Sequence, residues 1–502
     1  MGQEPGALPA LVAALATGGA DANPDMQEVA ANSADVLLDI TKVGPDFALH
    51  VAHEPGALPA LVAGVAAGSA ASAPKRLQRA AKSGAHVLGV MALTSPELAR
   101  RVAEEPGALP ALIGAVAAGR AAAVASLQTA AMHSAAALSS IIKAGPELVR
   151  RVAKEPRVLR ALVAAVAAAG AAAAAPNKLQ GTAVFCAAVL EDMTRASTEL
   201  ARRVADEPGA LPALVGAVAA GGPAAAPSHT LHRNVAGFSA GVLSDIARAG
   251  PELVRRVAEE PGALPALVAA VAAGSHAAAP DLQAATAYRA GNAPELVQRL
   301  ATELGALPTL VAAMADGGTA AAATLQGAAG NCAYLLTRMA LSSPELARRV
   351  AEEPGALPAL VAAVAAGSHA AAPDLQAATA YRAANSALAL ANITSADPAL
   401  ARRMTEARGA LPALITAEAA GSAAAEPAGR AVAAIRSWAQ VAVAAVGGAC
   451  GHCGRSANAA TGERLRLCVG CNAARFCNAE CQRQAWSSHK AACRAFIATS
   501  GG

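Results

Sequence analysis

One short phrase recurs along the whole chain and limits the folds that the chain can adopt. Variants of "GALPALV" begin at Gly6, Gly56, Gly107, Arg157, Gly209, Gly262, Gly305, Gly355 and Gly409, which places them about 50 residues apart. A phrase that returns at a fixed period predicts one supersecondary unit repeated many times. Such units stack on their neighbours, because one unit cannot bury its own apolar face. The sequence therefore predicts an array of about nine units.

Each unit predicts three helices, as the copy that begins at Ser343 illustrates. Ser343 is a typical N-cap and Pro344 a typical first helical residue, and Pro354 ends this first helix because its ring disfavours helical geometry before it. The second helix is "GALPALVAAVAAGS", and the third runs from about Asp374 to Ile393. Hydrophobic residues make up 55% of the chain and aromatic residues only 2%, so that the apolar residues are mainly Ala, Val and Leu. Ala and Leu are strong helix formers, which favours a mainly α fold.

The helical triplet with "GALPALV" opening its second helix resembles the armadillo repeat family over roughly residues 1–447. The resemblance implies an α-α superhelix, an armadillo-like solenoid. The units exceed the roughly 40–47 residues expected of such repeats, and the excess falls in the loop between helices two and three. The array starts inside a unit, and the interval just after Ala290 lacks about ten residues. Whether the natural chain has these two features stays open.

Armadillo proteins that carry nuclear-import signals use a ladder of Trp and Asn on their third helices, and this chain lacks it. The residues at the Asn position are Asp39, Val90, Ser140, Asp192, Asp245, Arg338 and Asn392. The resemblance therefore does not extend to import receptors. Two interpretations of the three aspartates stay open: ordinary solvated residues, which we favour, or an acidic strip that binds basic peptides.

We interpret pairs such as Arg348–Arg349 as a solvated face that forms ion pairs with nearby glutamates.

Charge and composition exclude several classes of partner. The formal net charge is only +4, and aromatic platforms for base stacking are scarce, so we expect no nucleic-acid partner. The first residues lack the positive region of a signal peptide, and the apolar run from Ala161 is too short to span a bilayer. We expect no membrane partner and an intracellular location, with nucleus and cytoplasm both open.

Cys186 and Cys332 lie among apolar residues of third helices and are expected to be buried and inert.

The carboxyl-terminal tail holds the remaining seven of the 9 cysteines. Its metal-ligating residues come in four pairs: Cys450 and Cys453, Cys468 and Cys471, Cys477 and Cys481, and His489 and Cys493. Zinc takes four tetrahedral Cys or His ligands, and a spacing of two or three residues lets one turn offer two of them. Eight ligands predict two closed Zn²⁺ sites, whose binding would supply the folding free energy of so small a segment. Disulfides or a redox Cys-x-x-Cys pair explain the complete ordered set less well.

The order of these residues is similar to the MYND zinc finger family. The family's closing pattern reads here as Phe476-Cys477, Cys481-Gln482, Trp486-x2-His489 and Cys493. The resemblance implies a MYND-type finger within residues 448–502, in which two zinc ions are cross-braced. Cys450, Cys453, Cys477 and Cys481 would hold one ion, and Cys468, Cys471, His489 and Cys493 the other. It also implies that Gln482 and Trp486 bind short proline-containing peptides.

These predictions point to a non-catalytic adaptor, in which a solenoid scaffold binds an unknown partner and the finger captures proline-containing segments of other proteins. The sequence shows no nucleophile–base motif, no glycine-rich phosphate loop and no open metal position, so we expect no enzyme. One alternative is a structural zinc cap on a solenoid that alone binds partners. A second alternative is a protein related to methyltransferases, although no SET domain adjoins the finger.

Overall fold

The computed structural model describes most of the chain. The described residues are 6–120, 124–170, 177–220, 230–273, 297–298, 301, 305–316, 323–367, 373–444, 450, 452, 465–471, 473–477 and 479–500. They fall into two compact units, residues 1–270 and residues 271–502, and each unit is described by itself. The short interval after Ala290 and the predicted domain boundary at residue 447 lie outside the described residues, so those predictions stay open.

The described first helices of the repeats are short, and each follows a serine, an aspartate or a glycine at the N-cap position. These helices are α3 (Pro45–His53), α6 (Pro96–Glu104), α9 (Pro146–Lys154), α12 (Thr198–Asp206), α15 (Pro251–Glu259), α21 (Pro344–Glu352) and α24 (Pro398–Glu406). The Ser343 hydroxyl accepts a hydrogen bond from the Leu346 amide at 3.1 Å, which confirms the predicted N-cap. The side chain satisfies one of the amides that a helix start leaves unpaired.

The second helices are almost wholly apolar and follow a tight turn. They are α1 (Ala7–Ala16), α4 (Ala57–Gly68), α7 (Ala108–Gly119), α10 (Val158–Gly170), α13 (Ala210–Ala220), α16 (Ala263–Ala273), α19 (Ala306–Asp316), α22 (Ala356–Gly367) and α25 (Ala410–Ala419). The residue before each helix is left-handed, with φ of 82° at Gly107 and 84° at Gly355. Glycine adopts this conformation without a steric cost, which explains the glycine that opens the repeated phrase. Within the described ranges, Arg157 is the only non-glycine residue with a positive φ, at 68°.

The third helices are the longest. They are α2 (Pro24–Val43), α5 (Lys75–Thr94), α8 (Ala125–Lys143), α11 (Asn177–Ala196), α14 (Thr230–Arg248), α20 (Ala323–Ser342), α23 (Pro373–Ala396) and α26 (Ala425–Ala444). The predicted third helix at Asp374–Ile393 is α23, which begins one residue earlier and ends three residues later.

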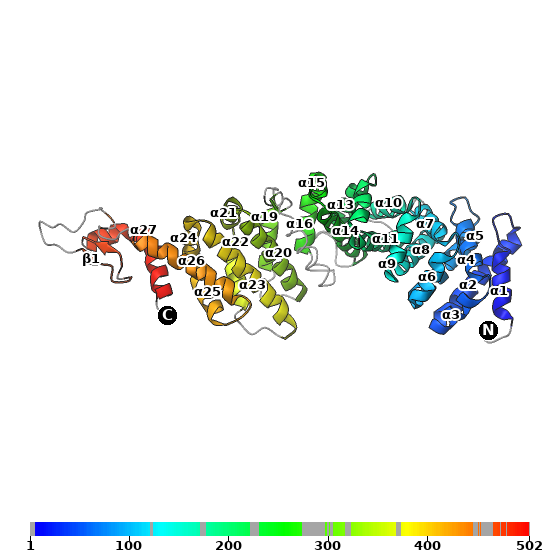
Figure 1. Ribbon diagram of the computed structural model, residues 1–502, viewed down its shortest axis with the longest axis horizontal. Helices are drawn as coiled ribbons and strands as arrows, with labels where there is room; N and C mark the ends of the chain where they lie inside the picture. The colour runs from blue at the N-terminus through cyan, green and yellow to red at the C-terminus, as the bar shows by residue number, and fades with distance from the viewer. Residues whose placement is uncertain are drawn as a thin grey trace. The chain divides into compact units, whose positions relative to one another are not determined.

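Helices of the same kind pack against one another from repeat to repeat. In the first unit, α2, α5, α8, α11 and α14 follow one another side by side, and so do α1, α4, α7, α10 and α13 (Figure 1). The second unit repeats the pattern with α20, α23 and α26 beside α19, α22 and α25. One buried apolar cluster runs from Val12 to Leu267, so the core of the first unit is continuous across its repeats. This arrangement confirms the predicted mainly helical repeat fold.

Arginine side chains of the first helices connect neighbouring repeats. Arg101 donates a hydrogen bond to the Ala52 carbonyl oxygen at 2.9 Å, and Arg203 donates one to the Ala153 carbonyl oxygen at 2.9 Å. Arg348 pairs with Asp397 of the following repeat at 2.9 Å, and within its own helix it pairs with Glu345. The arginine pairs thus form local ion pairs on a partly exposed face, as Arg348 does with Glu345, and in addition they contact the neighbouring repeats. A long guanidinium side chain spans the gap between helices that are one repeat apart.

No single helix in the described part of the chain is both long and apolar enough to span a membrane. The pair Pro344–Glu352 and Ala356–Gly367 reaches that length and composition only jointly, and it is bent by 88°.

Candidate metal centre

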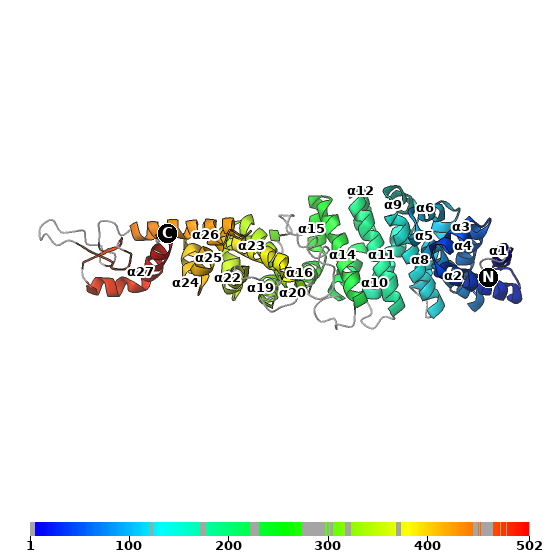
Figure 2. The same ribbon diagram turned by 90° about the horizontal axis from the view of Figure 1, so that it is seen from below.

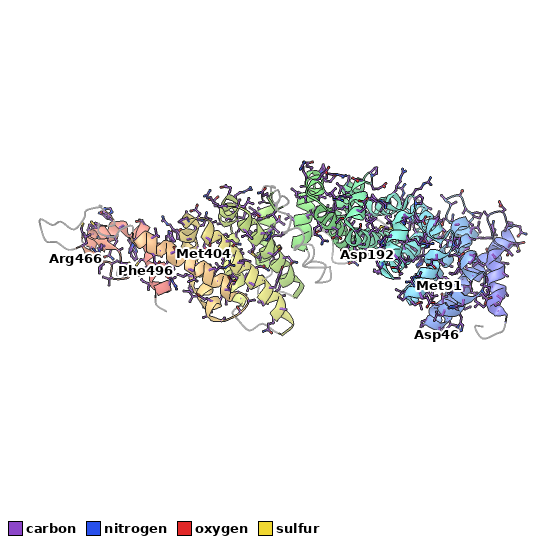
Figure 3. The ribbon with its side chains drawn as sticks, viewed as in Figure 1. Asp46, Met91, Asp192, Met404, Arg466 and Phe496 are labelled. Carbon is purple, nitrogen blue, oxygen red and sulfur yellow. The ribbon has the colours of Figure 1, made fainter. Side chains whose placement is uncertain are left out.

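The described elements of the carboxyl-terminal segment are a small hairpin and one long helix. Strand β1 (Arg466–Leu467) pairs antiparallel with β2 (Arg475–Phe476), with Arg466 opposite Phe476. Helix α27 (Ala479–Ser500) follows, and Figure 3 labels Arg466 of the hairpin and Phe496 of the helix. Cys468 and Cys471 lie in the turn after β1, and the Cys468 amide closes this turn on the Ala474 carbonyl oxygen at 2.8 Å. The hairpin thus holds the pair Cys468 and Cys471 beside α27, the helix that carries His489 and Cys493.

Four predicted ligands converge at a first site. Cys468, Cys471, His489 and Cys493 are all buried, and their ligand atoms lie within 4.8 Å of one another. The Cys468 and Cys493 sulfurs are 3.8 Å apart, and the Cys471 sulfur is 3.7 Å from His489 Nε2. A tetrahedral zinc with Zn–S bonds of about 2.3 Å separates its sulfurs by about 3.8 Å. The residues therefore fit a tetrahedral zinc ion.

Helical spacing explains how two ligands of this site come from α27. His489 and Cys493 are four residues apart, so their side chains leave the same face of the helix. Gln482 lies two turns earlier, and its amide nitrogen is 3.6 Å from the Cys468 sulfur. The Phe476 ring meets the His489 ring edge-on, with centroids 5.4 Å apart. These contacts fix the orientation of the imidazole and give one ligand sulfur a hydrogen-bond donor.

The thiols of the first site have opposed pKa shifts. Burial raises the pKa of Cys468, but hydrogen bonds from the Cys471 and Gly470 amides outweigh it and lower the pKa overall. Burial, together with the Cys468 thiol, raises the pKa of Cys493 to about 12. Burial lowers the pKa of His489, which keeps its imidazole neutral and able to bind a metal. A cation bound here would stabilise the thiolate that burial disfavours.

A second group contains Cys450, Cys477 and Cys481, whose sulfurs also lie within 4.8 Å of one another. The Cys477 amide donates to the Cys450 sulfur at 3.4 Å. Cys453, the predicted fourth member, lies outside the described residues. Cys477 follows β2 and Cys481 is in the first turn of α27, so the hairpin and helix again supply neighbouring ligands. The described ligands alternate along the chain between the two groups, as cross-bracing requires.

The finger packs on the last repeat through residues that the sequence analysis missed. Trp438 and Ala442 of α26 pack against the buried cluster of the finger, and α27 contacts both α24 and α26 (Figure 2). Trp438 is one of only 2 tryptophans in the chain, which was the signal available in the sequence. The last repeat therefore provides part of the core that the finger itself lacks.

Trp486 is placed differently from Trp438. It is 38% exposed, and its ring meets His489 edge-on with centroids 6.0 Å apart. Gln482 is half-buried and is turned toward Cys468. Trp486 thus packs one edge against the metal site and leaves part of its ring open to solvent.

Other residues singled out in the sequence have structural roles. Cys186 and Cys332 are fully buried, and burial raises the pKa of the Cys332 thiol to about 12, so both are inert as expected. The Asp39 side chain is 78% exposed, whereas Asp192 is 24% and Asp245 only 1% exposed. Asp245 forms an ion pair with Arg248, so these aspartates do not form one continuous acidic strip. The interpretation that they are solvated residues holds only for Asp39.

The fold and the thiol clusters define a helical repeat protein that carries a zinc-finger module. Residues 450–493 match the family model of the MYND finger, so this protein-interaction module is present at the position expected from its sequence pattern. None of the curated proteins matches the chain. Among the solved structures that match, the crystal structure of an engineered protein is similar over 99% of this chain and 99% of its own, with a TM-score of 0.58 and 17% identity. That likeness supports the fold alone.

Proposed function

We propose that the protein is a non-catalytic, intracellular adaptor whose finger binds two Zn²⁺ ions and captures proline-containing segments of other proteins. The observation that carries this proposal is the partly open Trp486 on a MYND finger. Tryptophan provides a flat apolar surface for a peptide, and apolar surface left in water at a small module is typical of binding sites.

The finger has two further exposed apolar side chains, which lie in β1 and in the turn after it. Val469 is 87% exposed and Leu467 is 48% exposed. Val469 follows Cys468, whose sulfur lies beside the Gln482 amide, so the turn after β1 adjoins α27 one helical turn before Trp486. Small modules place apolar residues in the core when they can. We therefore propose that these side chains remain outside because a partner covers them.

A quantitative pull-down compares the zinc-loaded chain with Trp486→Ala and with Leu341→Ala as a matched control. Leu341 is 58% exposed on α20, far along the chain from the finger, and controls for the loss of an exposed apolar side chain. Partners with proline-containing segments should be lost with Trp486→Ala and retained with Leu341→Ala. Retention of every such partner by Trp486→Ala would refute the proposal.

The packing of Trp438 favours a second candidate, in which the finger is a structural cap on the last repeat. A Cys468→Ala variant separates the two candidates, because it removes one ligand of the first site. Loss of solenoid stability with every partner retained would support the cap. Binding of S-adenosylmethionine in calorimetry would instead support the methyltransferase alternative, and we expect none.

A further inference from the structure

A cavity of about 440 Å³ opens between the third helices of the first unit. Its walls include Val90 and Leu93 of α5, Ala136 of α8 and Phe185 of α11. This volume lies within the range of about 300–1,000 Å³ that is typical of ligand pockets. Leu93 is 78% exposed, which leaves a large apolar side chain in water beside the cavity. The cavity can therefore accept an apolar group the size of one or two side chains.

Two imidazole rings form part of the same wall. His86 of α5 and His133 of α8 are stacked, with centroids 3.9 Å apart and planes 8° from parallel. Burial lowers the pKa of both, and that of His133 falls to about 4. At neutral pH the pair is therefore uncharged, and it adds a flat surface with polar ring edges to the apolar wall.

Lysine side chains surround this neutral wall. Lys42 and Lys82 lie close enough to lower the pKa of His86, Lys178 contributes in the same way at His133, and Lys143 lines the cavity. Among the described residues, no ion pair involves Lys82, Lys143 or Lys178. Most arginines of the same unit's third helices are paired, as Arg79 is with Glu28 and Asp35.

Two acidic groups near the cavity pair with a basic side chain of their own helix, although the buried Oδ2 of Asp192 has no hydrogen-bond partner. Asp39 pairs with Lys42 at 3.4 Å, and Asp192, which Figure 3 labels on α11, pairs with Arg195 at 3.5 Å. Lys143 acts on Asp192 only through its field. An approaching group therefore meets an apolar cavity with an excess of positive charge around it, which favours an anionic partner.

We propose that this cavity binds an acidic peptide segment of a partner protein, with an aliphatic or aromatic side chain inserted beside His86 and His133 and carboxylates facing Lys82, Lys143 and Lys178. The inference rests on the proposed adaptor function and names the partner class of the solenoid. A single cavity with a few lysines suits one inserted side chain better than a nucleic-acid strand, which needs a row of cations and stacking platforms.

A phage-displayed library of random dodecapeptides tests the inference on the zinc-loaded full chain. Selected peptides should combine Asp or Glu with a large apolar residue, and their affinity should fall when salt rises from 50 to 500 mM, because salt screens exposed charges. The baits are the natural chain, Lys143→Glu, Ser140→Trp, Lys75→Glu and Trp486→Ala. Thermal unfolding checks that each variant is folded.

Lys143→Glu should weaken the acidic peptides about tenfold, because it replaces an attraction by a repulsion. Ser140→Trp should weaken them as well, by filling the cavity. Lys75→Glu makes the same charge change at the far end of α5, about 16 Å along the helix from His86, and should have no effect. Trp486→Ala should lose only proline-containing peptides. The variant therefore distinguishes a failure of the proposed finger site from a failure of the proposed cavity site.

Three outcomes would overturn the inference. They are selection of no acidic peptides, equal binding of acidic peptides to Lys143→Glu and Lys75→Glu, and displacement of the peptides by a single-stranded oligonucleotide that itself binds more tightly.

Discussion

Replacing Arg157 by glycine should stabilise the fourth repeat. Arg157 has a φ of 68° in the turn before α10, where the other second helices have glycine. A left-handed conformation costs an L-residue about 1–2 kcal/mol. Glycine recovers that cost but gives the unfolded chain extra freedom that offsets about 0.4–1 kcal/mol. The Arg157 side chain is exposed, so its removal loses little packing. The net gain should be about 0.5–1 kcal/mol.

Hydrogen exchange measures this gain locally, which matters because a long repeat array need not unfold in one step. The relevant amides are those of Val158 and Ala161, which donate to the carbonyl oxygens of Glu155 and Arg157. In Arg157→Gly their protection should rise about twofold to fivefold. Arg160→Gly is the matched control, because glycine inside an exposed helix position destabilises by about 1 kcal/mol and should lower protection. Unchanged or reduced protection in Arg157→Gly would refute the reasoning.

Three further perturbations test other parts of the structure. Because the folded pKa of His133 lies near 4, below its ordinary value of 6.5, the unfolded chain binds an extra proton between these values. Stability of the first unit should therefore fall as pH drops from 6.5 to 4, by about 1–2 kcal/mol after allowance for partial exposure, and His133→Gln should flatten this slope in urea titrations. Arg101→Ala removes the bond to the Ala52 carbonyl oxygen and should cost about 1 kcal/mol in the same assay, whereas Arg120→Ala, an exposed residue, should cost nothing measurable. Chelation should release two zinc ions per chain, as measured by atomic absorption, with loss of α27 helicity by circular dichroism; retention of that helicity would contradict a structural role for the metal.

The repeated phrase made the helices predictable because each helix start depends on local chemistry. Ser343 and Pro344 sit at the start of α21 in both sequence and structure, and the glycine of "GALPALV" marks a left-handed turn. The grouping of Cys468 with His489 and Cys493 was predictable because the order of the ligands along the chain matches the family pattern.

Contacts between repeats were not predictable in the same way. The bond from Arg101 to Ala52 joins residues 49 positions apart and depends on how two helices stack, which local pattern does not specify. The stacking of His86 on His133 and the packing of Trp438 on the finger have the same origin. Nor could composition distinguish buried Asp245 from exposed Asp39, since both occupy the same position of the repeat.

The central claim is that the finger binds proline-containing segments through Trp486. Its most direct test is the affinity of one such peptide, taken from a partner retained in the pull-down, for the natural chain and for Trp486→Ala. Isothermal titration gives the affinity, and atomic absorption gives the zinc content of each protein. The account predicts at least about a tenfold loss of affinity in Trp486→Ala with two zinc ions still bound. Equal affinity in the two proteins, at equal zinc content, would contradict it.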